Sequence, residues 1–334
     1  MKKILAYILA SLLAMICLIG IVFFEKDVPL ADLKPLYANE HSKFIPILGM
    51  DVHVRDEGPL TDSIPLILLH GMSSSLNTWD SVAYYLKDQR RVISVDLPGF
   101  GMTGPNPVNV YNFKVYNQFL DSLTARLGID RFVLAGNSMG GAISWHYAVT
   151  HPNRLKQLVL IDAAGYPKTK EKGSLGFLIA STPILNNLLL YFTPKTLVRK
   201  SLESIYFDQS RVTDEQVTRF HDIVVREGNR AAALEIFKHG FGKPTEKISD
   251  VNVPTLILWG DHDVVIDVSN ADRFEKDIPG SKKVIFPKVG HVPMEEIPQR
   301  VAQEIKTFVQ PYYGSLSSRI PIFKSSASRS KQEI

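Results

Sequence analysis

A serine set between two glycines, directly after an apolar run, is the feature that most restricts how this chain can fold. Residues 131–135 read Arg-Phe-Val-Leu-Ala, as in a buried strand, and residues 136–140 read Gly-Asn-Ser-Met-Gly. The spacing predicts a strand that turns sharply into a helix, because the two glycines remove side chains that would collide with neighbouring backbone. We expect Ser138 to be strained at this turn and its hydroxyl to be exposed. The helix that residues 139–148 can form would point its first amides at that hydroxyl.

A serine hydroxyl becomes a useful nucleophile only when a base, and a group that orients the base, lie beside it. The apolar run 254–259 is followed by Gly-Asp-His-Asp-Val-Val, which offers the two carboxylates Asp261 and Asp263. After a further strand-like run comes His291, and a neutral histidine can accept a proton at physiological pH. His262 is the main rival for the base, but a residue adjacent to the acids in an extended turn points elsewhere.

Two other strands followed by turns precede the serine. Residues 64–69 run into His-Gly-Met-Ser-Ser at 70–74, and residues 91–96 run into a Gly-rich turn at 97–103. With the serine motif and the later Asp and His segments, they resemble the α/β-hydrolase superfamily over about residues 40–312, including its D-x-P-G-x-G-x-S/T signature. The resemblance implies an α/β fold: a mostly parallel central sheet flanked by helices, with an inserted helical cap.

The same resemblance implies roles for individual residues. Ser138 would be the nucleophile and His291 the base, and the family's G-x-x-D pattern selects Asp263 as the acid, which leaves Asp261 as a turn residue. The backbone N–H groups of Met72 and Met139 would form the oxyanion hole. In this motif the histidine of the first loop, His70, is usually structural.

Three stretches resemble single-pass, membrane-anchored monoacylglycerol lipases and related bacterial lipases and esterases: residues 136–141, residues 260–269 and the apolar N-terminus. This narrower resemblance implies hydrolysis of carboxylic esters of lipid-like substrates, such as monoacylglycerols or medium- to long-chain acyl esters. The alternatives on the same triad are a C–C bond hydrolase of the meta-cleavage type and a cofactor-free haloperoxidase or perhydrolase. A non-catalytic binding protein is a third. Ser138 argues against dehalogenases and epoxide hydrolases, which usually carry aspartate at this position.

The N-terminus predicts a membrane anchor. The run from residue 4 to residue 24 is uncharged, and at about 1.5 Å per residue a helix over it reaches across a hydrocarbon core of about 30 Å. Because no small-x-small cleavage site follows, we interpret residues 1–25 as an uncleaved transmembrane signal anchor rather than a removed signal peptide. Lys2 and Lys3 favour a cytoplasmic N-terminus, which would place the catalytic domain on the periplasmic or another non-cytoplasmic side.

The remaining chain divides into a core at 40–164 and 251–312, a cap at 165–250 and a disordered tail at 313–334. The cap segment is too long for a loop. Its residues 213–216 fit a capping box, and residues 230–238 predict a helix that ends near Gly240. Its apolar stretch, residues 175–192, would serve as an acyl-binding wall, as a lid that touches lipid, or as ordinary cap packing.

The composition of the chain argues against several classes of binding partner. A formal net charge of +4, without a dense basic stripe, argues against nucleic acid. The histidines and the one cysteine, Cys17, lack metal-ligand spacing, so we expect neither a metal nor another cofactor. The expected partners are a small lipid or ester substrate and, through the N-terminal helix, a membrane, whereas nothing in the sequence indicates a protein partner.

Overall fold

One mixed sheet organises the computed structural model, which describes residues 24–167, 190–241 and 246–309, together with residues 3, 4, 7, 182 and 185–188. In the described chain eight strands lie in the order β1-β2-β4-β3-β5-β6-β7-β8. Their bounds are Ser42–Ile47 (β1), Met50–Glu57 (β2), Leu66–Leu69 (β3), Val92–Val95 (β4), Phe132–Asn137 (β5), Leu155–Ile161 (β6), Thr255–Gly260 (β7) and Lys282–Phe286 (β8). Two pairs are antiparallel, β1 with β2 and β2 with β4, whereas the strands from β3 to β8 are parallel to one another. The predicted, mostly parallel α/β-hydrolase sheet is confirmed.

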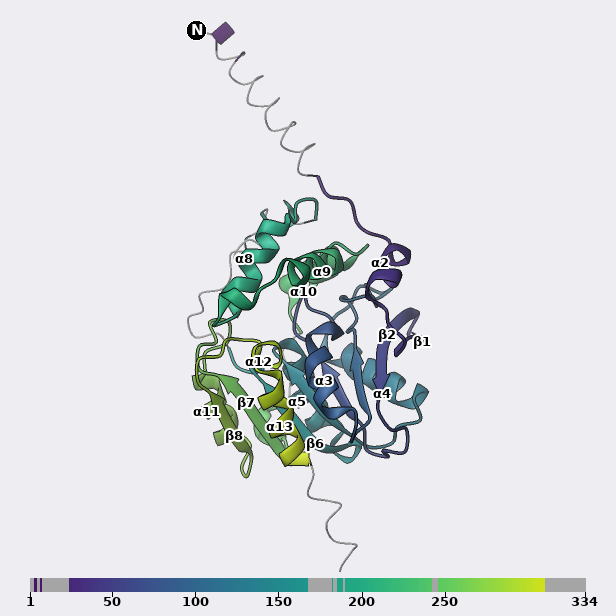
Figure 1. Ribbon diagram of the computed structural model, residues 1–334, viewed down its shortest axis with the longest axis vertical. Helices are drawn as coiled ribbons and strands as arrows, with labels where there is room; N and C mark the ends of the chain where they lie inside the picture. Colours follow the sequence, from purple (N-terminus) through teal and green to yellow (C-terminus); the bar gives the residue numbers. More distant parts are fainter. Residues whose placement is uncertain are drawn as a thin grey trace, which may run out of the picture.

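Helices cover both faces of this sheet (Figure 1). The helices outside the cap are Leu30–Tyr37 (α2), Asp80–Leu86 (α3), Phe113–Arg126 (α4), Met139–Thr150 (α5), Ser269–Asp277 (α11), Pro293–Glu296 (α12) and Pro298–Val309 (α13). Short 3-10 helices lie at Leu76–Trp79, Pro152–Arg154, Gln209–Arg211 and Ile248–Asp250. The chain therefore forms the three layers expected of a sheet that is buried on both sides.

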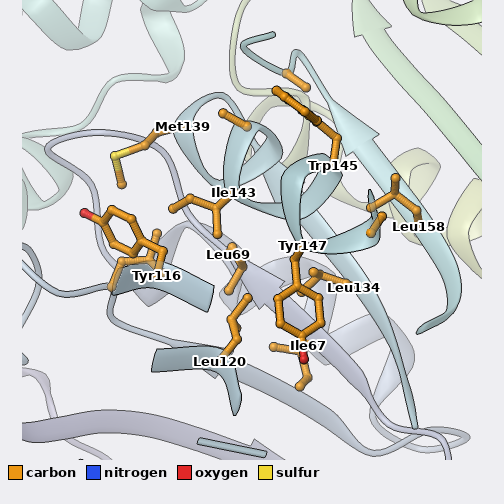
Figure 2. Packing of buried hydrophobic residues seen from close by; sticks show 14 of the residues in the cluster. Ile67, Leu69, Tyr116, Leu120, Leu134, Met139, Ile143, Trp145, Tyr147 and Leu158 are labelled. Atoms are coloured by element: carbon orange, nitrogen blue, oxygen red, sulfur yellow. The ribbon is translucent and has the colours of Figure 1, made fainter. Parts of the chain in front are cut away.

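The central strands are apolar throughout because both of their faces are buried. Every residue of β3, β4, β5 and β7 is buried. Alternate side chains of a strand point to opposite faces of the sheet. Leu66 and Leu68 pack against α3 and α13 on one face. Ile67 and Leu69 pack against α4, α5 and α11 on the other face. Figure 2 shows this second layer, with Ile67 and Leu69 beside side chains of α4 and α5.

Between β6 and β7 the chain forms helices Leu185–Leu188 (α7), Lys195–Ile205 (α8), Asp214–Val224 (α9) and Asn229–His239 (α10). The longer three lie together at one end of the sheet (Figure 1). The predicted capping box is confirmed, since Thr213 and Gln216 bond reciprocally, and α10 ends at Gly240, which has a φ of 60°. In the apolar stretch 175–192, residues 175–181, 183, 184 and 189 lie outside the described residues.

The segment directly after the apolar N-terminus packs on the cap helices. Val28 forms a bridge with Arg226, and the Tyr37 hydroxyl donates to Asp222 at 2.7 Å. Among the described helices none is long and apolar enough to cross a membrane. The predicted anchor over residues 1–25 lies almost wholly outside the described residues, as does the predicted tail at 313–334.

The loops after β5, β6, β7 and β8 meet at the carboxyl edge of the parallel sheet. Parallel strands all end at the same edge, which is where open α/β sheets bind ligands. In the sequence these loops begin at residues 138, 162, 261 and 287. The topology thus brings together segments that are separated by up to 150 positions.

Candidate active site

The turn at Ser138 has the strained geometry that its sequence predicts. Ser138 joins β5 to α5 with a φ of 53°, a left-handed value that is unfavourable for a residue with a side chain. A Cβ atom at Gly136 would lie 2.2 Å from the carbonyl oxygen of Gly140, and one at Gly140 would lie 2.4 Å from that of Leu69. Only glycine allows strand and helix to approach this closely. The predicted steric reason for both glycines is therefore confirmed.

His291 and Asp263 lie side by side, although 28 positions separate them. The His291 Nδ1 atom is 2.7 Å from Asp263 Oδ2, and both side chains are buried. The other carboxylate oxygen, Oδ1, accepts the backbone N–H groups of Val265 and Ile266 at 2.7 and 2.9 Å. The carboxylate is thus fixed by its own loop and faces one nitrogen of the imidazole.

The rival residues lie elsewhere. Asp261 accepts the Lys288 N–H at 2.7 Å and contacts the ring of its exposed neighbour His262 at 2.6 Å. These two side chains therefore stabilise the turn after β7 and its contact with residue 288. His70 is buried, accepts the Leu97 N–H at 3.0 Å through Nε2, and lies 2.7 Å from the Gly71 carbonyl oxygen through Nδ1. Burial lowers the pKa of His70. His70 therefore ties two loops together.

The residues predicted to supply oxyanion-hole amides flank the serine. Met72 and Met139 line the same cavity as Ser138. The Met72 loop approaches the elbow closely, since a Cβ atom at Gly71 would lie 3.2 Å from the Ser138 Cβ. Met139 is the first residue of α5, where amides have no acceptor within the helix. Both loops are thus in a position to offer backbone donors near the hydroxyl.

A cavity of about 450 Å³ opens above these residues and contains Ser138 and His291 in its lining. This volume lies within the usual range for small-molecule sites. Most of its wall is apolar and comes from the cap, through Leu197, Val198, Leu202, Ile205, Phe220, Val224, Ala233, Leu234, Phe237 and Phe241. The polar groups are few: besides the serine and histidine they include Thr78, Arg230 and Glu295.

Residues that sequence reasoning did not single out hold the His291 loop. The Asn137 side chain donates to the carbonyl oxygen of His291 at 3.1 Å, and Glu296 accepts the Gly290 N–H at 2.6 Å. The N–H of His291 itself donates to Ile205 at the end of α8, which links the loop to the cap. Asn137 lies inside the serine motif that the sequence shows. Its hydrogen-bond partner, His291, is 154 positions away, so the sequence did not indicate the contact.

Glu295 forms a polar corner of the largely apolar cavity. It accepts the Thr78 hydroxyl at 2.5 Å and the Tyr206 hydroxyl at 2.6 Å, and so joins the core to the end of α8. Burial raises the pKa of Glu295. Glu295 and Glu296 follow His291 closely in the sequence. Acidic residues are also common in the first turn of a helix, so this pattern alone does not show that Glu295 lines a cavity.

Asp162, Asp263 and His291 each place one possible metal-ligand atom, a carboxylate oxygen or a ring nitrogen, within 4.8 Å of the other two. Among the described residues this is the group close enough to surround a cation. His291 and Asp263 are already hydrogen-bonded, and one oxygen of each carboxylate already accepts backbone N–H groups. This arrangement fits proton transfer rather than metal coordination, and we assign no metal to it.

Comparisons with known proteins agree with the fold described above. Residues 64–181 match the family model for the α/β-hydrolase fold. Lipase 3 of Moraxella sp. (strain TA144) is 28% identical over 80% of this chain and 84% of its own length. Human monoacylglycerol lipase ABHD6 is 27% identical over 73% of this chain and 74% of its length. The 2-hydroxy-6-oxo-2,4-heptadienoate hydrolase of Pseudomonas putida is 28% identical over 73% of this chain and 87% of its length.

The fold also matches a solved structure. A bacterial membrane phospholipase A superposes with a TM-score of 0.69 and 27% identity, and the match covers 92% of this chain and 98% of that one. Together with the sheet topology and the family match, these similarities show that the chain contains an α/β-hydrolase domain with that fold, and they support a hydrolytic function.

Proposed function

We propose that this chain is a serine hydrolase that cleaves carboxylic esters of lipid-like substrates through an acyl-enzyme at Ser138. One observation carries the proposal: a strained serine and a hydrogen-bonded His291–Asp263 pair meet at one largely apolar cavity. The apolar wall from the cap suits an acyl chain. The similarity to two lipases and to a membrane phospholipase A supports the same substrate class.

In the proposed mechanism the Ser138 hydroxyl attacks the ester carbonyl while His291 takes its proton. Asp263 keeps a proton on Nδ1 of the imidazole, which leaves Nε2 free to act as the base, and stabilises the imidazolium that forms. The N–H groups of Met72 and Met139 bind the oxyanion. His291 then protonates the leaving alcohol, and water releases the acyl group with the roles reversed.

The first test is a panel of p-nitrophenyl esters and monoacylglycerols of increasing chain length, assayed with the wild type and with Ser138→Ala. We expect activity on medium or long chains and a loss of roughly 10⁴-fold or more in the variant, whose fold should persist. Activity that survives Ser138→Ala would overturn the proposal.

A C–C bond hydrolase is the second candidate, supported by the relative from Pseudomonas putida and by Arg230, a cation in the cavity wall that could hold an acidic substrate. Arg230 is, however, paired with Asp27 at 2.7 Å, which offsets its charge. A vinylogous diketone acid therefore belongs in the panel. Turnover of this acid alone, lost in both Ser138→Ala and Arg230→Met, would favour the second candidate.

We also propose that residues 1–25 anchor the protein in a membrane, with the catalytic domain on the non-cytoplasmic side. The support is the uncharged apolar run from residue 4 to residue 24. Membrane fractionation of the full chain, with carbonate and detergent washes, tests this. Release by carbonate would contradict it.

A further inference from the structure

A second buried carboxyl group, Asp162, lies directly behind the Asp263–His291 pair. Asp162 follows β6, has a φ of 45° and is 0% exposed. One oxygen of its carboxyl group, one of the Asp263 carboxylate and one ring nitrogen of His291 lie within 4.8 Å of one another. The proposed mechanism gives this side chain no role.

The hydrogen bonds around Asp162 leave one of its oxygens without a donor. Its Oδ1 accepts the Gly260 N–H at 2.9 Å, and its own N–H donates to the Leu258 carbonyl at 3.0 Å. Among the described residues the buried Oδ2 has no donor, and an oxygen of this carboxyl group lies within 4.8 Å of one of Asp263. Two carboxylate oxygens cannot bond each other unless one carries a proton.

The charges that face Asp162 favour a protonated form. Burial raises the pKa of the Asp162 carboxyl well above its usual range, and the adjacent Asp263 raises it further. Glu296, the last residue of α12, acts in the same direction, whereas the Gly260 N–H opposes the shift. Among the described residues His291 also has a ring nitrogen within 4.8 Å of this carboxyl group, and it is hydrogen-bonded to Asp263.

We propose that Asp162 and Asp263 share a single proton, which resides on Asp162 and forms a hydrogen bond to the Asp263 carboxylate. Asp162 is then a positioning residue that acts through Asp263. The inference rests on the proposed function, in which Asp263 orients His291. The pair carries one proton and one negative charge throughout the reaction, and no proton leaves it. The additional donor holds the carboxylate in place and lowers its tendency to take the Nδ1 proton from the imidazole.

Two substitutions separate this role from others. Asp162→Asn keeps both contacts, because its carbonyl can accept from Gly260 and its amide can donate to Asp263. We expect its kcat to stay within about threefold of the wild type. Asp162→Ala loses the donor, and kcat should fall about tenfold or more with little change in KM. An Asn variant as impaired as Asp263→Asn would overturn the inference, because a charge on Asp162 would then be needed. An Ala variant equal to the wild type would also overturn it.

A substrate-free measurement keeps the inference distinct from the proposed ester chemistry. Above about pH 4 the unfolded chain releases the Asp162 proton while the folded protein retains it, so the contribution of this proton to the stability of the wild type decreases as the pH rises. Asparagine has no such proton. In urea titrations from pH 5 to 7, the pH slope of unfolding free energy should therefore differ between wild type and Asp162→Asn by one proton. Equal slopes would overturn the shared proton even if Ser138 proved to cleave esters, and a one-proton difference would stand even if it did not.

Discussion

Asp263→Asn tests the proposed orienting role sharply, because the change keeps the size of the side chain. Asp263 Oδ1 accepts two backbone N–H groups, and Oδ2 lies 2.7 Å from His291 Nδ1. In the variant the amide oxygen keeps the backbone donors, so the NH₂ group faces the imidazole. A donor at that position favours the tautomer protonated on Nε2, which cannot take the proton of Ser138.

We expect kcat to fall about 10⁴-fold, equivalent to about 5.5 kcal/mol, as the same exchange does in serine proteases. Asp261→Asn is the matched control, since the Asp261 carboxylate accepts the Lys288 N–H, a bond that the amide oxygen of asparagine can keep, and its kcat should change about twofold at most. The assay is steady-state hydrolysis of the best p-nitrophenyl ester, with circular dichroism to show that both variants fold. A loss of less than about tenfold in Asp263→Asn would refute the reasoning. So would an equal loss in Asp261→Asn.

Three further predictions concern the elbow, the cavity and acid stability. Gly140→Ala places a Cβ atom 2.4 Å from the Leu69 carbonyl oxygen and should lower the free energy of unfolding in urea by about 1–3 kcal/mol; an unchanged midpoint would contradict this. Ala233→Trp fills part of the cavity and should shift the preference toward shorter esters, whereas Ala231→Trp, exposed on the same helix, should leave the chain-length profile unchanged. Burial alone would raise the pKa of Asp96, but His53 at 2.7 Å lowers it below the usual value, so its ionised form stabilises the fold. That contribution should be lost as the pH falls below about 4, and Asp96→Asn should flatten the acid limb of thermal stability.

The elbow could be predicted from sequence because its causes are local. A strained serine needs small residues on both sides, and these sit within five positions, from 136 to 140. The order of strands, turns and candidate side chains then indicated the fold. The choice of Asp263 over Asp261 came from a pattern; the structure adds that Asp263 faces the imidazole while Asp261 accepts from Lys288.

What the sequence did not reveal depends on long-range contacts. Asp162 reads as the end of a strand, and only the parallel neighbours β6 and β7 bring it to Asp263. The Arg230–Asp27 pair joins residues 203 positions apart, so no local pattern in the sequence indicated that Asp27 contacts the cavity wall. Such pairs become visible only when the topology is known.

Covalent labelling with a fluorophosphonate, followed by peptide mass mapping, tests the central claim most directly, because it asks whether Ser138 is an activated nucleophile without assuming a substrate. We predict one adduct on Ser138 in the wild type, none in Ser138→Ala, and strongly slowed labelling in His291→Ala. A folded wild-type protein that remains unlabelled, or that is labelled on another residue, would contradict the account.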